Sequence, residues 1–417
     1  MRVNLLTLLF FFTAVSLFAQ DFVQVSVGPT YSNQTYYTFD GDEVVSVPNT
    51  SWDLAFTATG FQDAGVFYNE ATALGGSTLE LYVSPTTSFD EVVDPNTITT
   101  PILFNDEQSW DRGAFNSIAT PGSFFDYGWG QYDQMSNSVI GSTIYVLKLR
   151  DGSYKKIMVE SLIITTYNVK IADLDGANEV TLTIDKADHA GADLVYYSIE
   201  TNSIVTTVPN QWDLLFTRYW TRLEDDIDYS LTGVFSGFGV EVAEARGVTP
   251  TDADLDDFVG SFTPVLDEIG WDWKMFSFMS GWSLEGDLSY FVKLADNTVW
   301  HILFVDFEGS STGTSVFQKF NLGMLTSVSD SDFVEEFSVF PNPVINEATV
   351  AVTLKEGGPI HLQLTNMLGQ QVWTSGKIDT NGGFQVFTLP ELNLAAGQYV
   401  LSLVKDGEVV SRKITQK

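Results

Sequence analysis

The sequence predicts an all-β protein made of two tandem, mostly antiparallel β domains followed by a small C-terminal β-sandwich. Three observations predict this class. Two long segments repeat the same landmarks in the same order, short alternating runs recur along the chain, and the composition changes near residue 330. Helical periodicity is limited to short helix starts at 86–93 and 251–259.

Residues 1–20 are expected to be a secretory signal peptide. Arg2 places a positive charge ahead of an apolar run over 5–18, and Ala19-Gln20 offers a cleavage edge. The run is short for a membrane span, which needs about 20 apolar residues. Since no later stretch is apolar enough to cross a bilayer, we expect a secreted protein that does not span the membrane once mature.

The two tandem domains follow from a duplicated motif. The run WDLAFT at 52–57 returns as WDLLFT at 212–217, and each copy stands the same distance behind a Tyr-Tyr pair, at 36–37 and 196–197. In both copies two β-prone runs flank a turn-forming segment just before the Trp-Asp run, as in a β-hairpin. Each Trp-Asp run is expected to begin a further strand.

A second pair of landmarks closes each repeat. The segment 145–152 matches 290–297 without a gap, and both reach a turn signal, Asp-Gly or Asp-Asn, before another β run. We therefore predict one β domain over 21–172 and a second over 173–325.

Charge separates these domains from the end of the chain. The protein carries a net charge of −34, while residues 337–417 hold six basic and six acidic residues and are neutral. This shift predicts a linker at 326–336 and a separate domain at 337–417. So strong a negative charge would repel a phosphate backbone, so we expect no nucleic-acid partner.

About seven short strands in the last segment indicate a β-sandwich. This segment resembles the C-terminal sorting domain of the type IX secretion system of Bacteroidetes. The resemblance implies the type IX secretion machinery as a partner and a final location in the medium or on the outer cell surface. It is carried by three blocks, whose key residues are Pro341, Asn342, Pro343, Gly369, Gly397 and Tyr399.

The repeats, over about 25–320, resemble the HmuY-like family of all-β haem-binding proteins. The Tyr-Tyr pair, the Trp-Asp-Leu-x-Phe run and the Tyr-x-Val-Lys-x-x-Asp-Gly hairpin carry this resemblance. The family implies haem as the cofactor, commonly held by paired histidines, one of them after the Trp-Asp strand. Here Thr57 and Thr217 occupy that place, and repeat one has no histidine, so haem binding does not transfer residue by residue.

Of the three histidines, one is a candidate cofactor ligand. His301 follows Trp300 on an expected strand and aligns with Lys156 of repeat one, while His189 lies in a polar loop and His361 in the C-terminal segment. Neutral imidazole is the usual nitrogen ligand of iron and other metals. The alternative is a histidine that simply occupies a strand face or edge.

Three further residues are candidates for cofactor binding. Trp129 and Trp271 lie in Gly-rich segments between strands, where a ring could stack on a flat ligand such as a porphyrin or a sugar, and Met275 offers a thioether. The alternative is that all three pack in the core.

Asp252, Asp254 and Asp256 are candidate metal ligands, because oxygens spaced two residues apart suit calcium. The glycine and distal glutamate of an EF-hand loop are missing. Repeat one has Thr87, Ser88, Asp90 and Glu91 in this place, so a capped helix start is the alternative that fits both copies.

Catalysis is not expected. The chain has no cysteine, which removes thiolate nucleophiles and Cys-ligated metals, and no nucleophile-elbow motif. We therefore predict a non-enzymatic binding protein that captures an extracellular small ligand, with haem as the family-implied candidate. The alternatives are a surface structural or adhesive protein that binds glycan or protein, and a hydrolase with an unrecognised carboxylate site.

Overall fold

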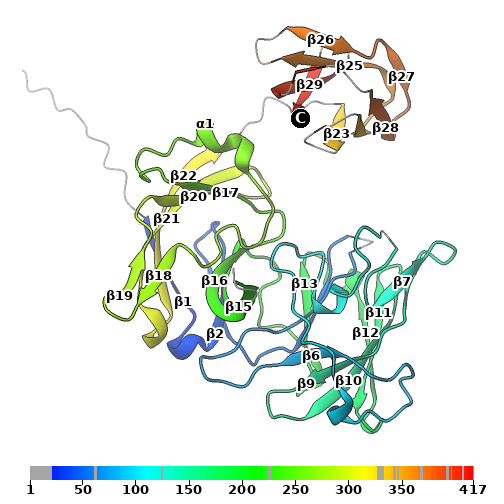
Figure 1. Cartoon of the computed structure of the whole chain (residues 1–417), viewed down its shortest axis with the longest axis vertical. Helices are drawn as coiled ribbons and strands as arrows, with labels where there is room; N and C mark the ends of the chain where they lie inside the picture. Colours follow the sequence, from blue (N-terminus) through cyan, green and yellow to red (C-terminus); the bar gives the residue numbers. More distant parts are fainter. Residues whose placement is uncertain are drawn as a thin grey trace, which may run out of the picture. The chain divides into compact units, whose positions relative to one another are not determined.

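The protein is described here from a computed structural model. It describes residues 21–60, 63–123, 125–223, 227–325, 333–340, 344, 347–366, 370–390, 394–395, 397–405 and 408–416. The expected signal peptide, most of the expected linker, the Pro341-Asn342-Pro343 block and Gly369 lie outside these ranges. The chain forms two compact units that divide between Met324 and Leu325 (Figure 1).

The all-β prediction is confirmed. Within the described residues the only α-helix is α1 (Leu255–Phe258), and the strands pair in antiparallel order. Short 3₁₀ turns complete the inventory: η1 (Pro29–Tyr31), η2 (Pro95–Thr97), η3 (Ala114–Asn116), η4 (Lys186–His189), η5 (Val259–Ser261) and η6 (Gly309–Ser311).

The first unit contains two lobes, each with one large and one four-stranded sheet. In the first lobe the large sheet has the order β12-β11-β10-β8-β7, with β9 joining β10 to β6, and the small sheet has the order β14-β13-β4-β5. The strands are β4 (Leu54–Thr57), β5 (Val66–Tyr68), β6 (Glu80–Val83), β7 (Gly130–Asp133), β8 (Ser138–Gly141), β9 (Tyr145–Lys148), β10 (Tyr154–Ile163), β11 (Thr166–Asp173), β12 (Val180–Asp185), β13 (Leu194–Ser198) and β14 (Ser203–Val205).

The second lobe repeats this plan. Its large sheet has the order β1-β22-β21-β20-β17, its small sheet has the order β16-β15-β2-β3, and a hairpin of β18 and β19 stands apart. The strands are β1 (Asp21–Ser26), β2 (Asn33–Tyr37), β3 (Val44–Pro48), β15 (Leu214–Arg222), β16 (Asp228–Ser236), β17 (Glu241–Arg246), β18 (Lys274–Ser277), β19 (Gly281–Leu284), β20 (Leu288–Lys293), β21 (Thr298–Phe307) and β22 (Thr314–Met324).

The strands that open each repeat complete the lobe of the other repeat. Strand β2 pairs with β15, so the first Tyr-Tyr pair lies beside the second Trp-Asp strand, and β13 pairs with β4 in the matching register. Strand β1 likewise pairs with β22, and β12 with β11. The first lobe therefore spans residues 49–210, while the second joins 211–324 to the N-terminal segment 21–48. The sequence boundary expected at residue 172 divides the repeats but not these lobes.

The Trp-Asp motif makes the same contacts in both lobes. Trp52 packs edge-on against Tyr196 with ring centroids 5.0 Å apart, and Trp212 packs against Tyr36 at 5.5 Å. Each following aspartate accepts a 2.7 Å hydrogen bond from a backbone N–H just after the paired Tyr-Tyr strand, Asp53 from Ile199 and Asp213 from Phe39. The motif thus fixes the turn that follows the neighbouring strand.

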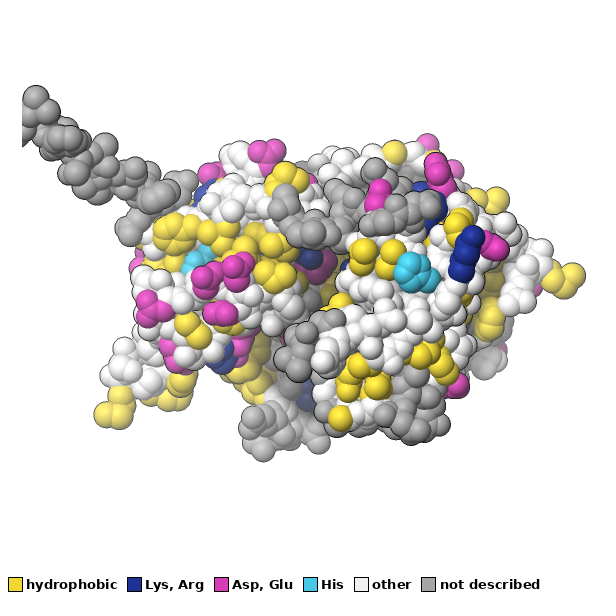
Figure 2. Space-filling view, turned by 90° about the horizontal axis from the view of Figure 1, so that it is seen from above, with side chains coloured by type: hydrophobic (Ala, Val, Ile, Leu, Met, Phe, Trp, Pro, Cys, Tyr) yellow, Lys and Arg dark blue, Asp and Glu magenta, His cyan; other side chains and the backbone are white. Residues whose placement is uncertain are grey.

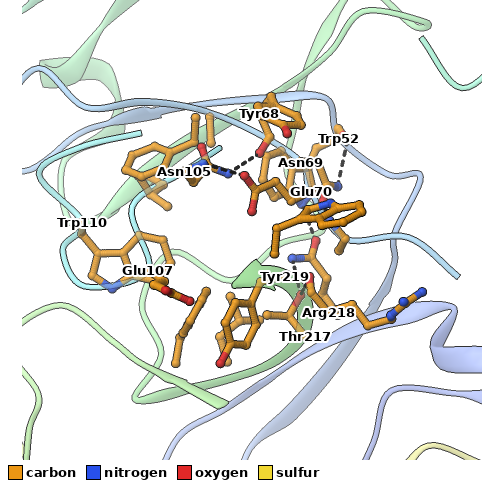
Figure 3. Close-up of a pocket in the computed structure, with 18 of the residues that line it drawn as sticks. Trp52, Tyr68, Asn69, Glu70, Asn105, Glu107, Trp110, Thr217, Arg218 and Tyr219 are labelled. Atoms are coloured by element: carbon orange, nitrogen blue, oxygen red, sulfur yellow. Dashed lines mark hydrogen bonds between the residues drawn. The ribbon is translucent and has the colours of Figure 1, made fainter. Parts of the chain in front are cut away.

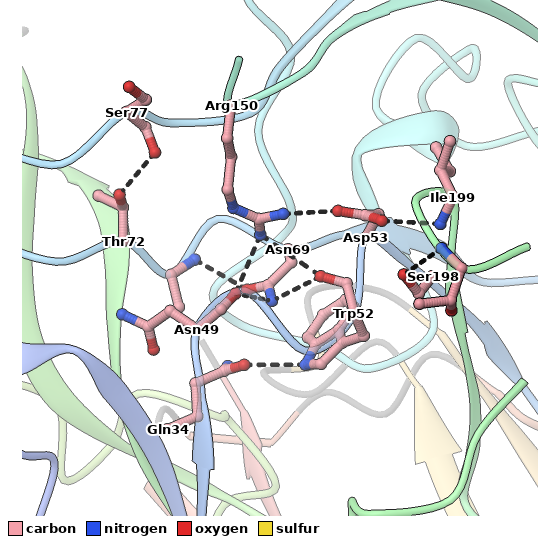
Figure 4. Close-up of polar contacts among 12 residues, drawn as sticks. Gln34, Asn49, Trp52, Asp53, Asn69, Thr72, Ser77, Arg150, Ser198 and Ile199 are labelled. Atoms are coloured by element: carbon pink, nitrogen blue, oxygen red, sulfur yellow. Dashed lines mark hydrogen bonds and ion pairs between the residues drawn. The ribbon is translucent and has the colours of Figure 1, made fainter. Parts of the chain in front are cut away.

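Among the described residues, only the first copy of this aspartate has an ion-pair partner. Arg150 Nη1 lies 2.5 Å from Asp53 Oδ1, and its Nη2 donates to the backbone oxygens of Asn49 and Trp52 (Figure 4). The matching position in repeat two is Ala295, and burial raises the pKa of the Asp213 carboxyl. The duplication has therefore diverged at this contact.

Arg150→Ala should lower the free energy of unfolding by about 3 kcal/mol, because it leaves the buried Asp53 carboxylate without its cation. Urea unfolding followed by tryptophan fluorescence would measure the loss. Arg112→Ala is the matched control, since Arg112 is exposed and forms no ion pair among the described residues. A loss no larger than that of the control would show that the pair is energetically unimportant.

The second unit is a separate β fold. One sheet has the order β23-β24-β28 and the other the order β26-β25-β29-β30, with β27 pairing to β25. Its core includes Val350, Leu364 and Leu401, which are fully buried. The strands are β23 (Val334–Phe340), β24 (Ala348–Leu354), β25 (Gly358–Asn366), β26 (Gln371–Thr374), β27 (Ile378–Thr380), β28 (Gly383–Leu389), β29 (Gly397–Lys405) and β30 (Glu408–Gln416).

Candidate functional site

The second lobe carries a groove of about 410 Å³ beside the β18–β19 hairpin. This volume lies in the range of small-molecule sites. Its wall is largely aromatic and aliphatic, with a few hydroxyl groups and two cations. The lining residues are Tyr31, Leu74, Arg218, Tyr229, Ser230, Leu231, Thr232, Trp271, Lys274, Met275, Phe276, Trp282 and Ser310.

Lys274 is one of the two cations. Its side chain is buried, and Nζ donates to the backbone oxygens of Thr232 at 2.7 Å and Trp271 at 3.4 Å. Nζ also lies over the ring of Trp273, 4.2 Å from the centroid. Burial away from water disfavours the charged form and lowers the pKa of Lys274 to about 7.

Arg218 is the other cation, placed in the groove by β15. Its Nη1 donates to Thr72 O at 3.0 Å and its Nη2 to Ser230 O at 3.1 Å, so most of its five N–H donors are left for other acceptors. Burial lowers the pKa of the guanidinium, which nevertheless stays charged at any physiological pH.

Neither cation has an ion-pair partner among the described residues, although the nearby Asp272 carboxylate favours the charged form of Lys274. No carboxylate of the described residues lines the groove. This is unusual in a chain with 54 acidic and 20 basic residues, and acidic side chains are widespread on the face seen in Figure 2. Buried charges are normally paired, so two unpaired cations in one groove indicate a place for an anion.

The hairpin beside the groove exposes apolar side chains. Met275 and Phe276 are about half exposed, and at the tip Phe278 and Met279 are 99% and 98% exposed. Trp282 packs against Phe307 on the lobe at 4.8 Å while keeping part of its ring accessible. The groove therefore has an open, apolar rim.

Two of the predicted cofactor-binding residues meet in this groove. Trp271 and Met275 both line it, although they come from a loop and from β18. Trp129 does not. It is fully buried in the first lobe, where Nε1 donates to Ala64 O at 3.0 Å, so it is a core residue with no accessible face for a ligand.

His301 lies on β21, away from the groove. Its ring stacks on Phe291 at 4.6 Å, and Nε2 is buried with no hydrogen-bond partner among the residues that the structure describes. Burial lowers the pKa of His301 to about 4, so the ring is neutral at physiological pH. The aligned Lys156 instead donates to the backbone oxygens of Phe89 and Glu91, which shows how the two repeats differ at this position.

The three predicted metal ligands do not converge. Asp254 is the N-cap of α1, where its side chain accepts the backbone N–H of Asp256 at 3.2 Å. Asp252 and Asp254 border the same hollow as His301, but no group of three His, Cys, Asp or Glu side chains in the described part of the chain is arranged to hold a metal ion. The helix-cap alternative accounts for Asp254.

The threonines that end the two Trp-Asp runs have structural roles. Thr57 Oγ1 lies 2.9 Å from Tyr167 Oη, and Thr217 Oγ1 accepts a hydrogen bond from Gln34 Nε2 at 3.1 Å. Both threonines are buried. Neither offers a ligand for iron.

Two sorting-motif residues lie in the described part of the second unit. Gly397 begins β29, and Tyr399 is buried with its hydroxyl donating to Ala395 O at 2.9 Å. Residues 338–417 match the family model of the secretion system C-terminal sorting domain. The chain carries a type IX sorting tail. The tail indicates export by the type IX secretion system of Bacteroidetes, to the cell surface or the medium, as predicted.

Other comparisons add no family for the body of the chain. No curated protein matches it. Two solved structures have slight likeness to this chain. Dimeric latent PorU from Porphyromonas gingivalis has 10% sequence identity and a TM-score of 0.18, and the match covers 84% of this chain and 31% of that chain. PorZ, a surface component of the type-IX secretion system of the same organism, has 8% identity and a TM-score of 0.16, and the match covers 96% of this chain and 58% of that chain. The chain thus spans less than two thirds of either structure.

In the described residues, no helix has the length and apolar character needed to cross a membrane.

Sequence reasoning missed the two cations. A usable signal existed, because basic residues are scarce in this chain and these two lie within strongly apolar segments, Trp271–Phe276 and Leu214–Trp220.

Proposed function

We propose that the mature protein is a non-enzymatic binding protein, exported by the type IX system, whose groove captures an extracellular organic anion with an apolar, flat body. The observation that supports this is the pair of buried cations, Lys274 and Arg218, without a carboxylate among the groove's described lining residues. A carboxylate, sulfonate or phosphate on the ligand would supply the missing charge. Trp271 and Trp282 would contact its apolar body.

The residues present do not fit the histidine-ligated haem that the HmuY-like resemblance implies. No histidine lines the groove, His301 lies on another sheet face, and Thr57 and Thr217 are engaged in buried hydrogen bonds. The carboxylates of a tetrapyrrole would suit the two cations. We therefore propose recognition of the anion and the flat ring, with no role for iron.

Titration with metal-free protoporphyrin IX tests this proposal. We expect saturable quenching of tryptophan fluorescence, with an affinity that drops at least tenfold in Lys274→Met. Lys148→Met is the matched control, because Lys148 is a first-lobe lysine paired with Glu80. Haem should bind within a few-fold of the metal-free ring. A haem-specific Soret shift that is lost in His301→Ala would instead assign the function to iron ligation.

The affinity for the anion should also depend on pH. Because the pKa of Lys274 is about 7, its ammonium charge is present at pH 6 and largely lost at pH 8.5. Binding of protoporphyrin IX should weaken over this range, and Lys274→Met should remove most of that dependence. Parallel pH profiles for the two proteins would exclude Lys274 from the site.

The exposed hairpin tip favours a second candidate function, adhesion to a protein or glycan. Phe278 and Met279 project almost wholly into solvent, and exposed large apolar groups mark interaction sites. Replacement of both by serine would then abolish adhesion while leaving the groove's anion affinity unchanged. Loss of adhesion together with loss of anion affinity would show that the hairpin tip forms part of the groove's binding site.

A further inference from the structure

A second cavity lies between the two four-stranded sheets of the first unit. Its free space is about 60 Å³, and its wall includes side chains from both lobes (Figure 3). Since one water needs roughly 10–15 Å³ by this measure, the cavity has room for about five non-hydrogen atoms. Nine aromatic side chains line it: Tyr36, Trp52, Phe67, Tyr68, Trp110, Tyr196, Tyr219, Trp220 and Phe235.

Two carboxyl groups reach this cavity. Glu70 is 8% exposed, and its Oε1 accepts the backbone N–H of Asn105 at 2.5 Å. Glu107 Oε2 is shielded from solvent and has no hydrogen-bond partner among the described residues, while the Thr221 side chain hydrogen-bonds to the same carboxyl group. Figure 3 shows the two carboxyl groups approaching the open space from different sides.

No cation of the described residues pairs with either carboxyl group. Arg218 is the one basic side chain that borders the cavity, and its guanidinium points away from the centre toward Thr72 and Ser230. Burial raises the pKa of Glu70 to about 8 and also raises that of Glu107. An acidic cavity inside an aromatic wall is therefore left without positive charge.

We propose that this cavity binds a small organic cation of the alkylammonium class, held by the aromatic rings between Glu70 and Glu107. Aromatic faces attract quaternary and methylated ammonium groups, and the attraction is strongest where water is excluded. The two carboxylates would neutralise the bound charge. The cavity shares Arg218 with the groove but has its own aromatic wall and carboxyl groups, and the proposal does not depend on the function proposed for the groove.

Other titratable groups near the cavity are acids or phenols. Asp106 adjoins Glu107 in the same loop, and Asp267 is coupled to Glu107 electrostatically, with burial raising the pKa of Asp267 to about 7. Tyr219 Oη is buried and has no hydrogen-bond partner in the described part of the chain. These groups favour a bound cation over a bound anion, because positive charge in the cavity stabilises the deprotonated form of each acid or phenol.

Calorimetric titration of the mature full chain with tetramethylammonium chloride tests this inference. We expect one site whose affinity rises about tenfold from pH 7 to pH 9, because binding must displace one proton from a group with a pKa of about 8. Glu107→Gln should weaken binding at least tenfold at pH 9. Glu70→Gln should weaken binding and also remove the pH dependence.

Two controls make the result decisive. The neutral isostere tert-butanol should not bind, and Glu91→Gln, which removes an exposed acid far from the cavity, should bind normally. Equal binding of tert-butanol would show that the cavity is a simple apolar void that does not recognise positive charge. No binding of tetramethylammonium at pH 9, or unchanged affinity in folded Glu107→Gln, would overturn the proposal.

Discussion

A fragment of residues 21–172 will not fold, although it contains one complete sequence repeat. It lacks β12 and β13, which pair with β11 and β4 of the first lobe, and β14, which pairs with β13. It also carries β1 and β2, whose partners β22 and β15 are absent. About half of the sheet pairing would be lost, and strand edges that are buried in the lobes would be exposed. The free energy lost would exceed the net free energy of unfolding of a typical domain.

The fragment 49–210 is the matched comparison, since it is of similar length and contains all strands of the first lobe. We expect cooperative thermal unfolding and a protease-resistant core for 49–210, and neither for 21–172. Mixing separately produced 21–172 and 173–325 should restore the cooperative transition. Cooperative unfolding of 21–172 alone would contradict the strand pairing described here.

The second large effect is the pH dependence carried by Glu70. Its pKa is about 8 in the folded protein and near 4.3 when unfolded, so between these values the native state binds more protons than the unfolded state. Protonation of Glu70 therefore stabilises the native state at low pH. As pH rises from 5 to 8, the free energy of unfolding falls by about 4 kcal/mol because this contribution is lost. Above pH 8 the loss should level off.

Glu70→Gln keeps the acceptor for Asn105 N–H and removes the titration. The difference in unfolding free energy between the variant and the natural protein should grow by about 4 kcal/mol in favour of the variant from pH 5 to pH 8. Urea unfolding at three pH values measures it. Other raised acids, such as Asp193 and Asp267, affect both proteins equally and cancel in the difference. Parallel pH profiles would show that Glu70 titrates normally.

The fold class and the sorting tail could be predicted because both follow from patterns among residues that are close together in the sequence. Period-two alternation reports which residues share a strand face, and the tail blocks occur in a fixed order. Which strand pairs with which is not local information. The Tyr-Tyr run at 36–37 stands near Trp52 in sequence, yet it pairs with the strand after Trp212.

The candidate site was predicted only in part for a similar reason. Trp271 and Trp129 have the same Gly-Trp context, but one lines a groove and the other is fully buried. A glycine before a tryptophan indicates a tight turn and says nothing about what covers the ring. The importance of Lys274 depends on its burial and on the absence of an ion-pair partner among the described residues, which only tertiary structure provides.

Because β1 pairs with β22, β1 cannot form its native pairing until most of the chain has been synthesised. Val25 pairs with Ser315, so the first strand to be made must remain uncovered until almost the whole body of the protein has been synthesised. At roughly 5–20 residues per second that interval is about 15 to 60 seconds. During it the apolar side chains of Val23 and Val25 are available to chaperones and to other unfolded chains. The nascent protein is thus most prone to aggregation at its own beginning.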